Sequence, residues 1–291
     1  MITHSCPCCG TVLLQGLRAW HWQCSACCYE ASALGSEINQ AETRDRLDER
    51  VRGVALRDLR QTNFRQLLRL IESCLPTCAG HRSKPRLLDV GAGHGWFVQA
   101  ASTRFEVTGI EPDEAARAIA AADGVTLRAG FFPGCLDAAE RFDVISFNDS
   151  LEHMPDVGEA LLAAHRHLLP DGVVVLNLPD ARGFFYRLSR VLALLGWSGP
   201  FDRMWQVGLP SPHLHYFRRA NLNILAQRAG LAPVAQGRLE SLRLRGLYAR
   251  IAYARPGATL STALLWLAML PLLLAMRLAP SDIMVLAYRR V

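Results

Sequence analysis

Four cysteines near the start of the chain have the spacing of a metal site. They form two C-x-x-C pairs that are separated by fourteen residues. Thiolates at this spacing can close a tetrahedral shell around zinc, and a closed shell of four sulfurs is typical of structural sites. We therefore predict one structural Zn ion, with Cys8 and Cys28 as alternative ligands beside the pairs. The predicted ligands are Cys6, Cys9, Cys24 and Cys27.

A glycine-rich loop, Gly91 to Gly95, carries a second set of residues that could do chemistry. It follows the apolar run LLDV, which is typical of a buried parallel strand, and open parallel sheets bind ligands at the carboxyl ends of their strands. Glycines there let backbone N–H groups approach a ligand closely. Asp89, just before the loop, suits a ligand with an ammonium group. Glu111, at the end of the next strand-like run, could accept hydrogen bonds from ribose hydroxyls.

A dinucleotide such as NAD is the main competing ligand for this loop. Its G-x-G-x-x-G fingerprint needs glycine at position 96, where this chain has Trp96. Asp89 also suits an ammonium group better than a pyrophosphate. The simpler alternative is that Asp89 caps a turn and that Glu111 is a solvated residue at a strand end.

Four segments in order resemble the class I S-adenosylmethionine-dependent methyltransferases, particularly the bacterial branch similar to ubiquinone-pathway and glycan methyltransferases. They are LLDVGAGHGWF, GIEPD, FDVISFNDSLEHMPD and PHLHYFRRANLNILAQRAGL, and the resemblance covers roughly Leu87 to Leu231. Four motifs in order are far more specific than any one of them. The resemblance implies a Rossmann-like fold, S-adenosylmethionine as cofactor and methyl transfer as the activity.

The resemblance also assigns a cofactor site. The glycine loop with Asp89 would line the methionine end of the cofactor, and Glu111 would bind its ribose. Gly130 and Phe131 would border the adenine, where many relatives have an acidic residue, and the end of the fourth strand would lie near the sulfonium. The predicted cofactor-binding residues are Asp89, Gly91, Ala92, Gly93, Gly95, Glu111, Pro112, Gly130, Phe131, Asn148 and Asp149.

Three histidines are candidates for acid–base chemistry. Methyl transfer is an in-line displacement, so the enzyme mainly aligns the acceptor, and a base is needed only where the nucleophile must lose a proton. His153, in SLEHMP, is the best placed because imidazole titrates near neutral pH; the alternative is that it orients a loop. His213 and His215, in SPHLHYF, could line the acceptor pocket or simply pack against the neighbouring aromatic residues.

A doubly wound α/β sheet is the fold that would bring these residues together. The strand-like runs FEVTGI, VTLRAG, FDVISFN and GVVVLNL alternate with the helix-like runs EAARAIAAA and VGEALLAAHRHLL. RRANLNILAQRAG predicts a further helix, and PVAQGRLESL and DIMVLAYRR predict a final pair of strands. The pattern loosens between Ala181 and Pro212.

We divide the chain into three parts. Residues 1–34 form the Cys-rich module, which is similar to a zinc ribbon and too small to fold on a core of its own. Residues 35–80 contain an Arg-rich linker helix followed by a helix that packs on the next domain. Residues 81–291 form the methyltransferase domain, with an apolar helical insertion at 256–280 before its last strand.

The apolar insertion predicts association with a membrane. Residues 256–276 carry no charge, and a run of this length could cross a bilayer as one helix. A single crossing would separate DIMVLAYRR from its sheet, so we expect a hairpin bent at Pro271 that dips into the lipid. Arginines on both flanks would meet anionic headgroups. The alternative is a helix buried against the sheet or in a dimer interface.

The composition favours a globular enzyme with an anionic partner. The chain has 291 residues, of which 51% are hydrophobic and 20% charged, too many charges for a polytopic membrane protein. Its formal net charge of +6 favours acidic lipid, RNA or a phosphorylated substrate. The start, MITHSCPCCG, does not have the pattern of a signal peptide, so we expect a cytoplasmic, reducing environment with peripheral or re-entrant attachment to the inner membrane.

The leading functional hypothesis is O-methylation of a glycan, a lipid-linked intermediate or a prenylated ring at a membrane surface. One alternative is methylation of ribosomal RNA, because some guanine methyltransferases also join a zinc module to this fold. The tetrad Asn148 to Leu151 is a poor substitute for the N-P-P-Y-like motif of such enzymes. The other alternative is an adaptor that binds the cofactor without turnover.

Overall fold

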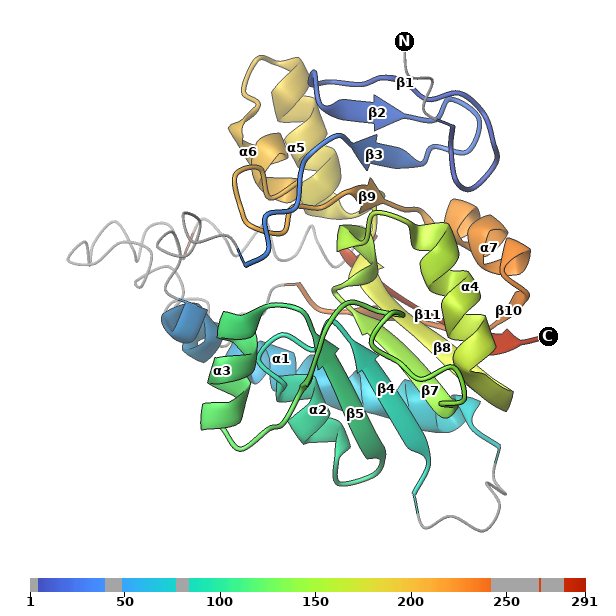
Figure 1. Cartoon of the computed structure of the whole chain (residues 1–291). Helices are drawn as coiled ribbons and strands as arrows, with labels where there is room; N and C mark the ends of the chain where they lie inside the picture. Colours follow the sequence, from blue (N-terminus) through green and yellow to red (C-terminus); the bar gives the residue numbers. More distant parts are fainter. Residues whose placement is uncertain (1–4, 40–48, 77–83, 242–266, 268–279) are drawn as a thin grey trace.

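The computed structural model of the chain describes residues 5–39, 49–76, 84–241, 267 and 280–291. Its largest feature is a seven-stranded mixed sheet (Figure 1). Five neighbouring strands are parallel, and the strand from the C-terminal end of the chain inserts antiparallel beside them. In sheet order the strands are β10 (Leu231–Leu239), β11 (Ile283–Arg290), β8 (Leu168–Pro179), β7 (Phe142–Asn148), β4 (Arg86–Val90), β5 (Glu106–Glu111) and β6 (Arg128–Ala129). The predicted α/β fold is confirmed.

Helices cover both faces of this sheet (Figure 1). The helices α1 and α2 pack on one face through Leu67, Ile71 and Phe97, which contact the buried valines of the central strands. The helices α4 and α7 cover the other face. Apolar side chains at helical spacing explain why these segments are helices that lie on a sheet. The helices of this domain are α1 (Glu49–Cys74), α2 (Trp96–Ala101), α3 (Glu114–Ala122), η2 (Leu151–His153), α4 (Val157–His167) and α7 (Arg219–Arg228).

The sequence predicted most of these elements at their observed positions. The largest differences from the prediction lie in the segment before β4 and in the segment between β8 and β10. Within the described part of 35–80 there is one helix, α1, and the start of the predicted linker helix falls on 40–48, outside the described residues. The region 181–212, where the pattern loosens, contains two helices that were not predicted: α5 (Phe184–Leu194) and α6 (Gly199–Met204).

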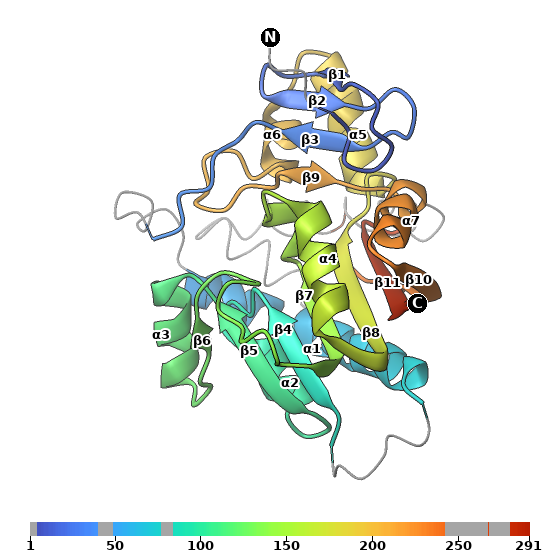
Figure 2. The same cartoon turned by 45° about the vertical axis from the view of Figure 1, so that its right-hand side comes forward.

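The Cys-rich module forms a second sheet, which is completed by a strand from the methyltransferase-like part (Figure 2). Its strand order is β1-β2-β3-β9, and β9 pairs antiparallel with β3. The strands are β1 (Leu14–Gln15), β2 (His21–Gln23), β3 (Glu30–Ser32) and β9 (His215–Tyr216). Cys6, Cys8 and Tyr29 belong to the same buried cluster as the strands of the large sheet. The module is therefore joined to the larger domain by a shared core and a shared sheet.

An aromatic cluster attaches the helices α5 and α6 to this module. Trp20 of the module stacks on Phe201, with ring centroids 5.9 Å apart, and meets Trp205 edge-on at 5.7 Å. Below the aromatic rings, the buried Glu30 carboxylate accepts hydrogen bonds from His21, at 2.8 Å, and from the Tyr186 hydroxyl, at 2.7 Å. The buried aromatic rings and the hydrogen-bonded Glu30 carboxylate together stabilise the contact between the Cys-rich module and α5–α6.

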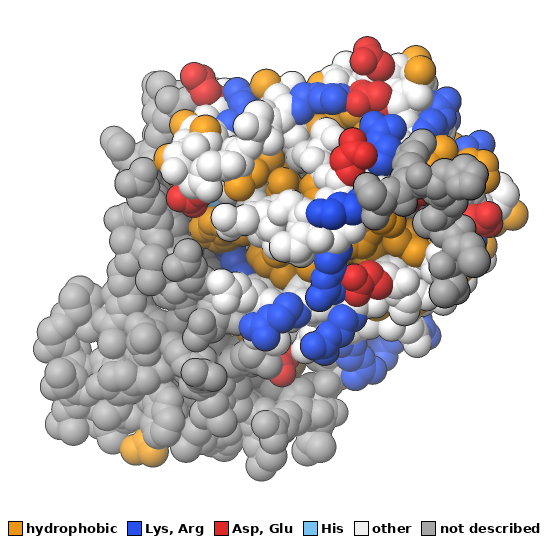
Figure 3. Space-filling model, turned by 90° about the horizontal axis from the view of Figure 1, so that it is seen from below, with side chains coloured by type: hydrophobic (Ala, Val, Ile, Leu, Met, Phe, Trp, Pro, Cys, Tyr) orange, Lys and Arg blue, Asp and Glu red, His pale blue; other side chains and the backbone are white. Residues whose placement is uncertain are grey.

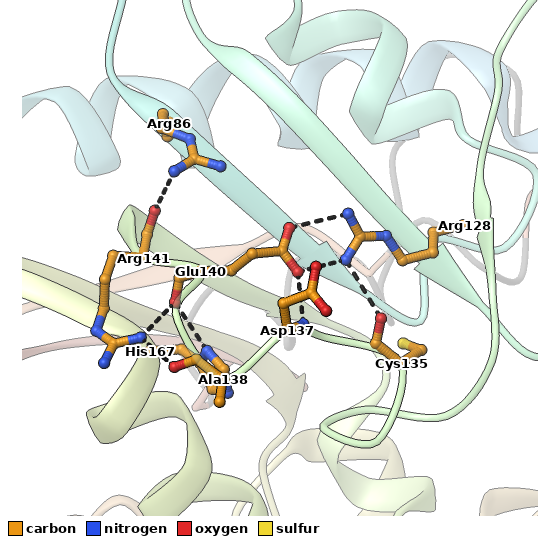
Figure 4. Close-up of polar contacts among 8 residues, drawn as sticks. All are labelled: Arg86, Arg128, Cys135, Asp137, Ala138, Glu140, Arg141 and His167. Carbon is orange, nitrogen blue, oxygen red and sulfur yellow. Dashed lines mark hydrogen bonds and ion pairs between the residues drawn. The ribbon is translucent and has the colours of Figure 1, made fainter.

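A polar network joins the segment between β6 and β7 to the end of α4 (Figure 4). Arg128 of β6 binds the carboxylate of Glu140 through both guanidinium nitrogens, at 2.7 and 2.9 Å. The backbone carbonyl of Glu140 accepts a hydrogen bond from His167, at the end of α4. Lys and Arg side chains also gather on the face seen from below (Figure 3). The Arg128–Glu140 pair anchors the segment between β6 and β7.

No helix within the described ranges is long and apolar enough to cross a membrane. Apart from Leu267, the predicted apolar hairpin at 256–276 lies outside the described residues.

The Arg128–Glu140 pair predicts a pH-dependent contribution to stability. Arg128 lowers the pKa of Glu140 to about 2. Because the folded-state pKa is depressed, the stabilisation is complete above the ordinary glutamate pKa and disappears as the pH falls towards 2. We expect Glu140→Gln to lower the free energy of unfolding by about 1–2 kcal/mol at pH 7, a value reduced for the partial exposure of Arg128.

Urea unfolding of both proteins at a series of pH values measures this effect. The wild type and Glu140→Gln should differ most above pH 5 and converge at the acid end. A difference that does not change with pH would contradict the assignment.

Candidate active site

The glycine loop lies at the carboxyl edge of the large sheet, between β4 and α2. Gly91, Gly93 and Gly95 have positive φ angles of 74°, 53° and 72°. A Cβ on Gly91 would lie 2.6 Å from the Cβ of Ser150, and a Cβ on Gly95 would lie 2.7 Å from a methyl group of Val125. The loop therefore needs glycine for its backbone conformation and, at these two positions, for space.

Asp89 is buried directly below this loop. Its side chain lines the cavity described below, and its residue is 1% exposed. Burial raises the pKa of Asp89 to about 7, although a hydrogen bond of 2.8 Å from the Ser146 hydroxyl lowers it. No described cation is among the groups that set this pKa. A cationic ligand would therefore stabilise the ionised carboxylate.

Glu111, the last residue of β5, holds the loop from the neighbouring strand. Its Oε2 accepts a hydrogen bond from the backbone N–H of Gly93, at 2.7 Å, and its Oε1 accepts one from Asp113, at 2.8 Å. Burial raises the pKa of Glu111, and these backbone donors lower it. Each carboxylate oxygen keeps a second acceptor position, so Glu111 can still accept hydrogen bonds from hydroxyl groups.

Asn148 and Asp149 approach the loop from the end of β7. The Asn148 side chain accepts a hydrogen bond from the Asn177 amide of β8. Asp149 has a positive φ of 55°, and its N–H donates to the Asn177 carbonyl at 2.8 Å. Burial raises the pKa of Asp149 to about 6, against the opposing effect of Arg60. The parallel register places both residues at the level of the loop.

A cavity of about 260 Å³ lies where these elements meet. Its lining includes six of the predicted cofactor residues, which are Asp89, Gly91, Ala92, Gly93, Asn148 and Asp149. Sequence reasoning missed Asn177 and three α1 residues that also line it, Arg60, Asn63 and Phe64. A polar residue at the end of the apolar run GVVVLNL is a signal that could have identified Asn177. The α1 residues have no such signal, because their helix lies far from the loop in sequence.

The other predicted cofactor residues lie outside this lining. They are Gly95, Glu111, Pro112, Gly130 and Phe131. Glu111 bonds directly to the loop, as described above. The carbonyl of Pro112 accepts hydrogen bonds from Asn39 and Arg117. Phe131 is 63% exposed, so the predicted adenine border is an open surface that stays a prediction.

Buried carboxyl groups set the electrostatics of the cavity. Asp89, Glu111 and Asp149 all have pKa values raised by burial. Three acidic groups around one glycine loop favour a ligand with positive charge and disfavour the pyrophosphate of a dinucleotide. Trp96, at the position where a dinucleotide loop needs glycine, lies under the Arg60 guanidinium, 4.6 Å from its ring centroid.

A second group of side chains, Glu152, His153 and His213, lies just beyond the end of β7. Potential ligand atoms of the three residues lie within 4.8 Å of one another, so they could hold a metal ion or exchange a proton. His153 donates from Nδ1 to the Pro212 carbonyl at 2.9 Å, which leaves Nε2 as the acceptor nitrogen. Burial lowers the pKa of His153 and raises that of Glu152. Both groups are therefore favoured in their neutral forms.

His213 and His215 differ in what they can still bind. His213 is held by Gln206 through Nε2, at 2.8 Å, and its buried Nδ1 has no partner among the described residues. Burial lowers the pKa of His213 to about 3. Both ring nitrogens of His215 are occupied, one by the Tyr29 hydroxyl and the other by the Met154 carbonyl, at 2.7 Å. This geometry favours a structural role for His215 over the predicted catalytic one.

The four predicted zinc ligands come together in the Cys-rich module. All their sulfurs lie within 4.8 Å of one another, with Cys6 to Cys27 at 3.5 Å and Cys9 to Cys24 at 3.4 Å. Sulfurs at the corners of a tetrahedral zinc site lie about 3.8 Å apart, so this donor set fits the ion. The cluster contains Cys9 and Cys27, and it includes neither of the alternative ligands Cys8 and Cys28.

The two knuckles of this cluster share one backbone geometry. The N–H of Gly10 donates to the carbonyl of Cys6 at 2.9 Å, and the N–H of Cys28 donates to that of Cys24 at 3.0 Å. Both donors have positive φ, 80° at Gly10 and 59° at Cys28. Cys28 therefore occupies the turn position that Gly10 occupies in the first knuckle.

The Cys-rich module positions the segment that carries His213 and His215. The Ser32 hydroxyl donates to the His213 carbonyl at 2.8 Å, and the Ser32 N–H donates to the Leu214 carbonyl at 2.9 Å. From the other side, Asn221 of α7 donates to the Cys27 carbonyl at 3.1 Å. The module thus contacts both the 213–216 segment and α7 through hydrogen bonds to backbone carbonyls.

Comparisons with known proteins identify the family of the larger domain. A family profile described as a methyltransferase domain matches residues 59–236. A ubiquinone biosynthesis O-methyltransferase of Alkalilimnicola ehrlichii is 33% identical over 108 residues, which cover 34% of this chain and 44% of that protein. The match thus spans less than half the length of this relative.

Solved structures share the fold at low sequence identity. An S-adenosylmethionine-dependent methyltransferase of Thermotoga maritima is 16% identical, with a TM-score of 0.53 over 84% of this chain and 95% of that one. A phosphoethanolamine N-methyltransferase of Haemonchus contortus is 15% identical, with a TM-score of 0.50 over 78% of this chain and 52% of that one. These similarities concern the fold alone.

The knuckle geometry predicts which cysteines bind zinc. We expect the wild type and Cys28→Gly to contain one zinc per chain, because glycine suits the positive φ at that position. The stability of Cys28→Gly should stay within about 1 kcal/mol of the wild type. Cys9→Ser removes one of the four clustered sulfurs and should lose the metal.

Elemental analysis of the purified proteins measures the metal content directly. Zinc retained in Cys9→Ser and lost in Cys8→Ser would show that the ligand register is wrong. A wild-type protein that folds without zinc would contradict the site itself.

Proposed function

The chain belongs to the class I S-adenosylmethionine-dependent methyltransferases, and from this we propose that it methylates an oxygen of a glycan, lipid-linked or prenylated-ring acceptor at a membrane surface. The observation that carries the proposal is the cavity at the glycine loop with buried carboxyl groups around it. Such a site suits a small ligand that carries positive charge.

Residues of this chain fit the different parts of the cofactor. Asp89 would bind the ammonium group, the backbone of the glycine loop would bind the carboxylate end, and Glu111 would accept hydrogen bonds from the ribose hydroxyls. Asn148 and Asp149 would lie near the sulfonium. S-adenosylmethionine, when bound, supplies a methyl group activated by its positively charged sulfur. The protein's main contribution is then to align the acceptor and exclude water.

The choice of oxygen as acceptor atom is supported by the relative named as an O-methyltransferase. An acceptor hydroxyl must lose its proton as the methyl group arrives, and His153 offers an unprotonated Nε2 for this proton. His213 and Glu152 lie beside it and would orient the acceptor. His215 would instead tie the Cys-rich module to the loop after η2.

The proposal also includes a structural zinc ion and attachment to a membrane. Four clustered thiols support a structural zinc ion, which would stabilise the wall that carries His213. The uncharged run 256–276, with arginines on both flanks, supports attachment to an anionic membrane from the cytoplasmic side.

Removing the carboxylate of Glu111 tests the cofactor assignment. We expect Glu111→Ala to weaken binding of S-adenosylmethionine by about tenfold or more, because unpaired ribose hydroxyls and an unanchored loop cost roughly 1.5–3 kcal/mol. Calorimetric titration of the wild type and the variant measures the two affinities.

Two variants provide matched controls for this titration. Glu106→Ala removes an exposed carboxylate from the other end of the same strand and should bind like the wild type. His153→Gln should also keep the affinity while lowering turnover. If the wild type binds NAD and ignores S-adenosylmethionine, the proposed function is wrong.

The raised pKa of Asp89 predicts that cofactor affinity depends on pH. With a pKa of about 7 in the free protein, part of the binding free energy at lower pH must remove a proton from Asp89. Affinity should therefore rise roughly fivefold between pH 6 and pH 7.5, because partial deprotonation of the ligand's amino group reduces the gain from ionised Asp89. Titrations across this range in Asp89→Asn should show weaker binding and a flatter profile. A flat profile in the wild type would contradict the role of Asp89.

A further inference from the structure

The helix α5 and the turn after it expose an unusual number of large apolar side chains. Leu188 and Val191 are 39% and 52% exposed, and Leu194 and Leu195, one turn further on, are 71% and 78% exposed. Trp197 follows, with 63% exposed. These spacings of three and four residues place the aliphatic side chains on one side of the helix. We define this set of five as the α5 patch.

The fold does not need this side of α5. The opposite side carries Tyr186 and Ser189, which are buried against the Cys-rich module and the rings of α6. Arg190, also on that side, binds the buried Glu30. Among the described residues, the helix therefore packs through its inner side and leaves the apolar side chains of the α5 patch exposed. Contiguous apolar side chains at the surface are typical of interaction sites.

The exposed charged residues of the segment that carries the α5 patch are all arginines. Arg182, Arg187 and Arg203 are exposed near it. Between residues 181 and 210 the sequence has a single acidic residue, Asp202, whose carboxylate is paired with Arg18 at 3.1 Å. A surface of this kind complements negative charge.

We propose that the α5 patch docks onto the interface of an anionic lipid bilayer. Leucines and valine would enter the boundary between headgroups and acyl chains, Trp197 would lie at headgroup level, and the exposed arginines would bind lipid phosphates. A second copy of the chain fits less well, because a twofold contact through the same face would bring Arg187 of both copies together. The patch and the apolar run 256–276 are different segments of the sequence.

The position of the patch gives docking a function in catalysis. The chain runs from α5 through α6 to Trp205, whose carbonyl accepts a hydrogen bond from the His213 N–H at 3.1 Å. His213 in turn lies beside Glu152 and His153. A bilayer that holds α5 would therefore lie near the acceptor side of the site, where a membrane-bound acceptor could enter. This part of the inference rests on the proposed function, whereas the docking itself does not.

Vesicle sedimentation with the full-length chain tests the docking. The wild type should bind vesicles of phosphatidylcholine with 30% phosphatidylglycerol. We expect Leu194→Ser/Leu195→Ser/Trp197→Ser to bind at least tenfold more weakly. Leu162→Ser/Ile224→Ser makes the same kind of change at two exposed positions on α4 and α7 and should bind like the wild type. Arg187→Gln/Arg203→Gln should weaken binding at low salt and less at high salt.

A second measurement places the patch in the lipid. Vesicles with brominated acyl chains should quench tryptophan fluorescence in the wild type, and Trp197→Phe should lose most of this quenching. Unchanged binding of the triple variant would overturn the proposal and assign membrane binding to another segment. Loss of a concentration-dependent dimer in the triple variant, without vesicle binding by the wild type, would overturn it in favour of a second copy.

Binding of S-adenosylmethionine by the triple variant separates this inference from the proposed function. Calorimetry should give the wild-type affinity, because no residue of the patch lines the cofactor cavity. A triple variant that loses both vesicle and cofactor binding has lost its fold, and the single variant Leu195→Ser then decides: wild-type vesicle binding by that variant counts against the patch.

Discussion

The burial of carboxyl groups around the glycine loop is the constraint on which the site depends. A buried ionised carboxylate costs free energy unless a partner compensates it, and Asp89 has only the Ser146 hydroxyl and nearby acidic groups as described neighbours in this role. Glu111 is held by two backbone N–H groups, so its charge is partly compensated within the loop. Asp89 is therefore the group with most to gain from a cationic ligand. By this argument Asp89, rather than the glycines, would be the residue that favours a cationic ligand.

The carboxyl edge of the large sheet also explains the position of the proposed acceptor side, beside Glu152, His153 and His213. The strands β7 and β8 end beside the loop, and the chain leaves them through η2 and through the α5–α6 region. The first exit carries Glu152 and His153, and the second returns to carry His213. Following a strand in the chain would not by itself fix the position of η2 or of the segment that carries His213. Both are held by the Cys-rich module, through the β3–β9 pairing and through Tyr29 and His215.

This arrangement gives the small module a different role from the one that its sequence suggests. A zinc ribbon that is attached by a linker would affect activity only by recruiting a partner. Here the module shares a core with the sheet domain and adds a strand from it to its own sheet. A change in the fold of the module would reach His213, because the Ser32 hydroxyl donates to the backbone carbonyl of that residue. The charged and aromatic residues of α5 and α6 complete the same junction and leave the α5 patch at the surface.

The sequence by itself determined the large sheet and the ends of its strands. Apolar runs, either alternating with polar residues or uninterrupted, identify the strands, because the local pattern of apolar residues reflects which side chains are buried. Gly91 follows one such run and Glu111 ends another, so these two residues mark the strand ends at the candidate site. It also determined the four clustered thiols, since two C-x-x-C pairs leave few ways to close a metal site. The tertiary structure decided which distant residues join them. Arg60 and Asn177 enter the cavity, and His215 becomes a tether, through packing between segments that are far apart in the chain. No local pattern encodes such contacts, because they depend on how complete elements are placed against one another.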